Sequence, residues 1–106
     1  MPKYMIAARY STSGMQGLKT EGGSSRRDVV IKSAESIGGK VEAFYFAFGK
    51  TDVVVIFDAP DNVAAARLAV SIGATGSVSL VTTPLLTPEE MDQAVKGDVD
   101  YRKPGG

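Results

Sequence analysis

Four stretches of the chain have the apolar pattern that is typical of β-strands. Each stretch is short and is either rich in β-branched and aromatic residues or alternates between apolar and polar residues. Gly, Pro or Asp residues bound these stretches. These runs predict strands at residues 3–10, 41–48, 52–59 and 77–83. A short loop around Gly49 separates the second run from the third, which predicts a hairpin.

Helical signals fill the intervals between these strands. Residues 11–23, rich in glycine, predict a short helix. Ser25 and Asp28 resemble a capping box at the start of the next helix, and Gly38 and Gly39 mark its end. The helix-period apolar face of this second helix consists of Val30, Ile31, Ala34 and Ile37.

Two further helices are expected in the second half of the chain. An alanine-rich helix begins at Pro60-Asp61-Asn62 and runs to about Ile72. After the interruptions at Pro84 and Pro88, the segment from Thr87 to Gly97 predicts a helix, because Thr caps it, Pro takes its first position and two acids follow. We divide the chain into one domain, residues 1–97, and an irregular tail, residues 98–106.

The order of these elements predicts the fold class. Strand, helix, strand, strand, helix, strand is the βαββαβ order of the ferredoxin-like α+β fold. Right-handed crossovers then give a four-stranded antiparallel sheet in the order 4-1-3-2, and the last helix is an addition at the C-terminus.

Both faces of this sheet are predicted to be apolar, although the helices of the fold cover only one. Burying such a face, at roughly 25 cal/mol per Å², is worth on the order of 10 kcal/mol before the costs of association. We expect a homodimer or higher oligomer packed sheet against sheet, with the C-terminal tail as the competing cover. The alternation of side chains along each strand does not decide which of the two faces meets the helices. One face consists of Met5, Ala7, Ala43, Tyr45, Val54 and Ile56, and of these Met5, Ala7, Tyr45, Val54 and Ile56 are the candidate interface residues.

Composition narrows the chemistry. The 106 residues hold 12 Lys and Arg against 12 Asp and Glu, so no net charge favours nucleic acid or an acidic membrane as a partner. The chain has no Cys and no His, which leaves carboxylates, Tyr, Lys, Arg and hydroxyls for any reaction. No apolar stretch is long enough to span a membrane, and the N-terminus lacks the apolar block of a signal peptide, so we expect a cytoplasmic protein. We also expect neither a cofactor nor a metal.

The triplet Gly49-Lys50-Thr51 also ends the phosphate-binding loop of many nucleotide hydrolases. That loop needs another glycine five positions earlier, where this chain has Phe44, and it must open a helix. Here a β-branched run follows instead, beginning at Val53. The triplet is therefore interpreted as part of a hairpin loop and not as a nucleotide site.

The topology brings several polar residues to one edge of the sheet. Arg9, Tyr10, Lys50, Asp52 and Ser77 should lie together there, so Arg9, Tyr10 and Asp52 are candidates for binding a polar small molecule. The alternative interpretation is that Arg9 and Asp52 form an ion pair that fastens the hairpin.

Other candidate ligand-binding residues lie elsewhere. Arg26 and Arg27, in the first turn of the second helix, could hold a phosphate or carboxylate or be a solvated helix start. Tyr45, between small neighbours, could line a pocket or pack against a second copy. Glu89, Glu90 and Asp92 are explained by the dipole of the last helix and not by a metal.

The segments "AFYFAFG", "EGGSSRR", "IGGK", "LLTPEE" and "VDYRKPG" resemble the GYD domain family over nearly the whole chain. The resemblance implies the dimeric α+β barrel fold, whose members include cofactor-free oxygenases, small decarboxylases and ligand-binding regulatory domains. The Gly-x-Tyr-Asp motif of the family maps onto Gly49 to Asp52, with Thr51 in place of the tyrosine.

Three functions are compatible with this sequence. The first is a homo-oligomeric protein that binds a small polar metabolite in a pocket between the sheet and the helices. The second is a regulatory or interaction module whose main property is sheet-to-sheet oligomerisation. The third is a cofactor-independent enzyme of the dimeric α+β barrel type, with no catalytic residue assigned.

Overall fold

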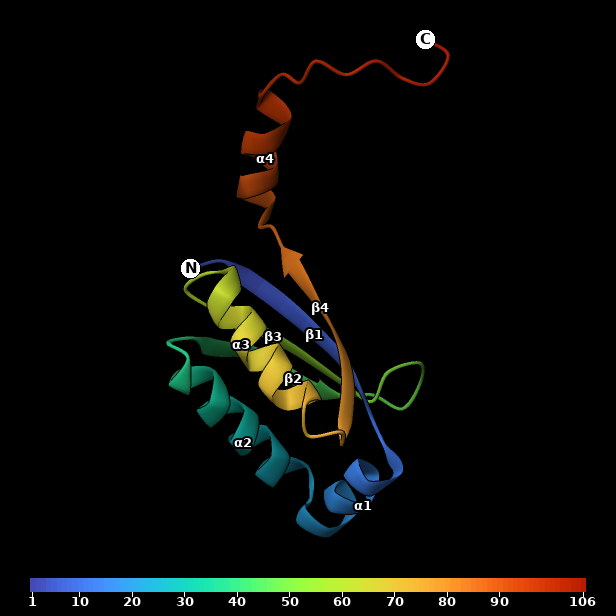
Figure 1. Cartoon of the computed structure of the whole chain (residues 1–106). Coiled ribbons are helices and arrows are strands. Elements are labelled where there is room, and N and C mark those ends of the chain that lie inside the picture. Colours follow the sequence, from blue (N-terminus) through green and yellow to red (C-terminus); the bar gives the residue numbers. More distant parts are fainter.

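A single four-stranded sheet organises the molecule. The computed structural model covers residues 1–106, and its strands are β1 (Lys3–Tyr10), β2 (Lys40–Phe46), β3 (Val53–Asp58) and β4 (Val78–Leu85). All neighbouring strands are antiparallel, in the order β2-β3-β1-β4, which is the predicted order counted from the other edge (Figure 1). The ferredoxin-like α+β fold is therefore confirmed.

Four helices surround or extend this sheet. They are α1 (Thr12–Glu21), α2 (Gly23–Ser36), α3 (Asn62–Gly73) and α4 (Pro88–Lys96). Helices α2 and α3 lie over one face of the sheet, whereas α4 and the tail extend beyond the end of β4 (Figure 1). The extension gives a radius of gyration of 16.8 Å, compared with about 13 Å for a compact domain of this length.

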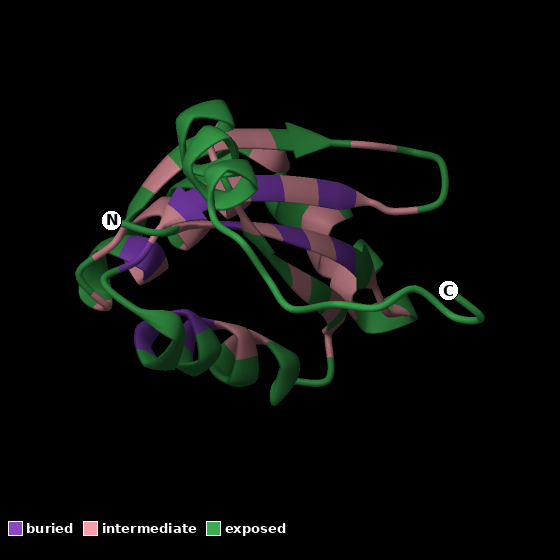
Figure 2. Ribbon diagram, turned by 90° about the horizontal axis from the view of Figure 1, so that it is seen from above, coloured by how far each residue is buried: buried purple, intermediate pink, exposed green.

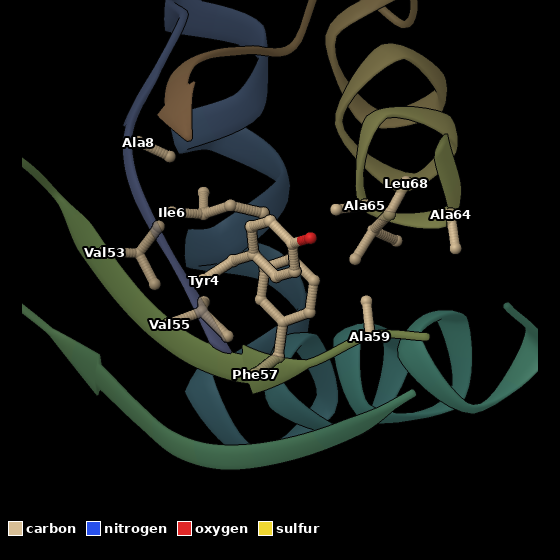
Figure 3. Close-up of a cluster of buried hydrophobic side chains, with 10 residues drawn as sticks. All are labelled: Tyr4, Ile6, Ala8, Val53, Val55, Phe57, Ala59, Ala64, Ala65 and Leu68. Atoms are coloured by element: carbon tan, nitrogen blue, oxygen red, sulfur yellow. The ribbon is translucent and has the colours of Figure 1, made fainter. Parts of the chain in front are cut away.

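The core lies between the sheet and α3. Alternate side chains of β1 and β3 point to the helices, as the period of a strand requires, and the rings of Tyr4 and Phe57 stack with centroids 5.5 Å apart (Figure 3). The hydroxyl of Tyr4 donates to Asn62 Oδ1 at 2.5 Å, so the polar end of this buried ring is satisfied. The ten buried residues of the cluster are Tyr4, Ile6, Ala8, Val53, Val55, Phe57, Ala59, Ala64, Ala65 and Leu68.

The predicted start of the second helix is wrong. Helix α2 begins at Gly23, and its N-cap is Gly22, which makes no side-chain capping bond. Gly22 has φ of 86°, a conformation that glycine adopts without steric cost, and its N–H also bonds Leu18 O to end α1. One glycine therefore joins the two helices, and Ser25 lies within α2.

Two strand ends also differ from the prediction. β2 ends at Phe46 because its partner β3 begins at Val53, opposite that residue, so Phe48 lies in the loop. Pro84 was predicted to interrupt the chain, yet it lies within β4. β4 is an edge strand, where proline is tolerated because an N–H facing solvent has no partner in the sheet.

The second face of the sheet has no cover in the single chain. Only 11 of the 106 residues are buried, and those on the sheet belong to the helix-facing set (Figure 2). The opposite face carries the apolar set predicted from the sequence together with Val81, which pairs with Ala7. The structure thereby settles which face meets the helices.

We predict that Phe57→Ala lowers the free energy of unfolding by about 3–5 kcal/mol, because it removes a fully packed ring and leaves a cavity. Phe57 is 1% exposed. Urea denaturation measures the change. Val63→Ala, on the exposed side of α3, is the control and should stay within about 0.5 kcal/mol of the wild type; a loss below about 1 kcal/mol for Phe57→Ala would contradict the packing described.

Candidate functional site

The residues predicted to gather at one sheet edge do lie together. The Arg9 guanidinium donates to the carbonyl oxygen of Lys50. The carboxylate of Asp52 accepts from the Tyr10 N–H at 2.9 Å, and the Ser11 N–H donates to Ser77 O at 2.9 Å. The ends of β1, β4 and the β2–β3 loop are therefore joined by hydrogen bonds.

The predicted ion pair between Arg9 and Asp52 is not formed. The four ion pairs of the structure include neither residue. The Asp52 carboxylate is occupied by the Tyr10 N–H, and Arg9 reaches the loop backbone instead. These two side chains fasten the loop, as the alternative interpretation supposed, but through the backbone.

A cleft lies elsewhere, between α1, α2, α3 and the start of β4. This cleft has a volume of about 630 Å³. Its apolar lining includes Leu18, Ile37, Leu68 and Ile72. Its polar lining includes Tyr10, Arg26, Ser33, Arg67, Ser71 and Ser77.

The cleft exists because α1 closely approaches Ser77, just before the start of β4. A Cβ atom built on Gly14 would lie 2.3 Å from Ser77 O, so only glycine fits at this contact. The positive φ of Gly22 then turns the chain from α1 into α2. Helix α3 supplies the third wall.

The α3 wall offers two unengaged donors, Arg67 and Ser71. Arg26 contacts Glu21, with 3.5 Å between their charged atoms, whereas Arg67 takes part in none of the ion pairs. The Ser33 hydroxyl donates to Val29 O at 2.8 Å. The hydroxyl of Ser71 makes no hydrogen bond within the protein, so Arg67 and Ser71 remain available to a bound molecule.

The structure separates the predicted site residues into four places. Tyr10 and Arg26 line the cleft. Arg9 and Asp52 hold the loop, and Arg27 lies outside the cleft with its Nε 3.2 Å from Asp28 Oδ1. Tyr45 lies on the uncovered face and is 72% exposed.

Sequence reasoning missed Arg67 and Ser71. They are four positions apart in the alanine-rich helix α3, so they lie on one side of it. That spacing could have indicated a polar stripe on the helix, because the neighbouring residues of α3 are almost all aliphatic. Gly14 and Gly17, three apart in α1, give the matching signal on the opposite wall.

The uncovered sheet face ends in a small charged cluster. Lys3 Nζ lies 2.9 Å from Asp58 Oδ1 and 3.0 Å from Glu42 Oε1. Hydrogen bonding to Asp58, and then to Glu42, raises the pKa of the Lys3 amine. The cluster therefore borders the apolar residues of this face with paired charges.

Because the chain has no His and no Cys, Asp and Glu are its remaining common metal ligands. No three of these acidic side chains lie close enough together to hold a metal ion. None of the four helices has the length and apolar character needed to span a membrane.

Comparison with known proteins identifies relatives of this fold. A family model described as the GYD domain matches residues 4–95. The crystal structure of MtbAldR is similar with a TM-score of 0.59 and 18% sequence identity, over 81% of this chain and 53% of that protein. This chain thus spans about half the length of MtbAldR, and the likeness concerns the fold. No curated protein matches the sequence.

We predict opposite effects for two glycines of α1. Gly14→Ala should lower the free energy of unfolding by about 1–3 kcal/mol, because its methyl group meets the Ser77 carbonyl. Gly17→Ala should leave stability unchanged or raise it by up to about 1 kcal/mol, because nothing lies within 4 Å of its added atom and alanine favours helix. Thermal unfolding distinguishes them, and equal effects would contradict the close contact at Gly14.

Proposed function

Since the chain belongs to the GYD domain family, we propose that it is a homo-oligomeric protein that binds a small polar metabolite in the cleft between α1, α2 and α3. The observation that carries the proposal is the free guanidinium of Arg67 at a cleft of about 630 Å³. Sites for small molecules commonly have volumes of about 300–1,000 Å³.

The lining favours an anionic ligand with a short apolar part. Arg67 can hold a carboxylate through two parallel hydrogen bonds, and the Ser71 hydroxyl, one turn along α3, can donate a third. Leu18 and Ile72 offer apolar contact. Arg26 adds less positive charge because Glu21 lies beside it.

Oligomerisation is supported by the uncovered apolar face. The chain exposes 7381 Å², whereas a compact monomer of 11.1 kDa exposes about 5,700 Å². The excess, to which the extended C-terminal segment also contributes, exceeds the roughly 800 Å² that each partner buries in a standard interface. A second copy packed sheet against sheet would cover Met5, Val54 and Ile56.

Two alternative functions predict different experimental outcomes from the proposed ligand binding. An interaction module without a ligand would oligomerise and respond to no metabolite. A cofactor-independent enzyme would convert the molecule that it binds. The cytoplasmic location inferred from the sequence stays a prediction.

We expect carboxylate-bearing metabolites in a thermal-shift panel to raise the melting temperature, because a ligand that binds only the folded state stabilises it. Arg67→Ala should abolish the shift. Arg27→Ala is the matched control, since Arg27 lies outside the cleft, and it should retain the shift. A panel without any stabilising anion, or a shift lost in both variants, would count against this site.

Sheet-to-sheet packing predicts that the wild type sediments as a dimer or larger species at micromolar concentration. Val54→Lys should shift it towards monomer, because burying an ammonium in an apolar interface costs several kcal/mol. Val63→Lys places the same charge on the exposed side of α3 and should leave the sedimentation unchanged. A wild-type monomer of 11.1 kDa would show that the chain covers its own sheet.

A further inference from the structure

The C-terminal arm, residues 86–101, has no packing partner in the single chain. Helix α4 contains no buried residue, and the arm extends away from the sheet (Figure 1). Met91 and Val95, four positions apart, form an exposed apolar stripe on α4. Further exposed apolar residues flank the helix at Leu86, Val99 and Tyr101.

Local interactions alone do not stabilise α4. Thr87 and Glu90 form a complete capping box, and the hydrogen bond from the Thr87 N–H lowers the pKa of the Glu90 carboxyl. Even so, isolated helices shorter than about 12–15 residues are marginal in water, and α4 has nine. The stripe of Met91 and Val95 therefore needs a surface to pack on.

The β2–β3 loop, residues 47–52, presents the most exposed aromatic side chain of the protein. Phe48 is 103% exposed. The loop is nevertheless held in place, by the bond from the Ala47 N–H to Asp52 O at 2.8 Å and by its contacts with Arg9 and Tyr10. An aromatic ring on a pre-ordered loop loses little entropy on binding and is the usual anchor of an interface.

The arm and the loop project from opposite ends of the sheet. Leu85, where the arm begins, pairs with Lys3 at the start of β1. Val53, where the loop ends, pairs with Ala8 near the end of β1. The arm root thus lies about 17 Å along β1 from the loop. A two-fold axis that lies between the two sheets and perpendicular to the strands would bring each arm to the end of the dimer at which the loop of the other copy lies.

The charges of the two segments are complementary. The loop carries Lys50 and contacts Arg9, and its one acid, Asp52, already accepts a hydrogen bond from the Tyr10 N–H. The arm carries five acids, among them Glu89, Glu90 and Asp92, against the single cation Lys96. More broadly, residues 1–85 hold nine Lys and Arg against seven Asp and Glu, and residues 86–106 hold three against five. This asymmetry favours contact between the arm of one copy and the body of another.

We propose that the arm of each copy docks on the partner copy, with Met91 and Val95 packed around Phe48 and the acids of α4 facing Lys50. The antiparallel two-fold arrangement rests on the sheet-to-sheet dimer of the proposed function. Arm docking adds a second contact, at both ends of that dimer. It gives the loop at the position of the GYD motif a role in self-recognition.

Cysteine crosslinking tests this arrangement directly, because the chain has no native Cys. Full-length Phe48→Cys and Met91→Cys proteins are mixed and mildly oxidised. We expect a disulfide-linked species of twice the 11.1 kDa of one chain that contains one copy of each variant. Val95→Cys replaces Met91→Cys as a second variant of the same stripe. Val63→Cys, exposed on α3, is the control partner and should not crosslink to Phe48→Cys above background.

Sedimentation of the same mixtures separates the possible failures. A dimer without the mixed crosslink overturns arm docking and leaves sheet-to-sheet packing intact. A monomer overturns both. An intramolecular disulfide in the Phe48→Cys/Met91→Cys double variant, at the mass of one chain, shows that the arm folds back on its own body and also overturns the proposal.

Discussion

The structure depends on one mismatch: the sheet is apolar on both faces, but the chain supplies helices for only one. β1 and β3 lie at the centre of the sheet, and both alternate between two apolar sets, so neither set can be turned to water without cost. α2 and α3 bury one set, and the core forms there. The other set stays open together with an unpacked arm, which is why the accessible surface and the radius of gyration are large for a chain of this mass.

The sequence pattern was sufficient for the elements and their order. Each apolar run is short and bounded by Gly, Pro or Asp, and the βαββαβ order leaves few topologies. The pattern did not predict element ends correctly where two local signals compete for a helix start, or where the neighbouring strand is too short to continue the pairing. Gly22 and Ser25 both offer a start for α2, and the chain uses Gly22 because the turn from α1 needs a positive φ. The alternation of β2 continues to Phe48, but β3 has no residue left to pair with it.

The candidate site was harder to predict for a related reason. The cluster around Arg9 and Asp52 follows from strand register alone, so its place was predicted correctly, whereas the Arg9–Asp52 pairing was wrong because backbone groups compete for both charges. The cleft is lined by polar and apolar residues from several elements that are far apart in the sequence. No motif joins them, and only the tertiary arrangement of α1, α2 and α3 brings Arg67 close to Arg26 and Tyr10.

Tyr10 connects the two surfaces for which we propose functions. Its side chain lines the cleft, and its backbone N–H holds Asp52, the residue that closes the loop carrying Phe48. The added atom of a Cβ at Gly14 would also lie 3.0 Å from the Tyr10 ring, so α1 limits the movement of that ring. A ligand that shifted Tyr10 would therefore act on the loop through a direct hydrogen bond. Coupling free energies between two binding equilibria are reciprocal, so any effect of a ligand on self-association implies an equal effect of self-association on ligand affinity. Under the two proposals, the affinity of the cleft for a ligand would therefore have to be measured at a stated oligomeric state.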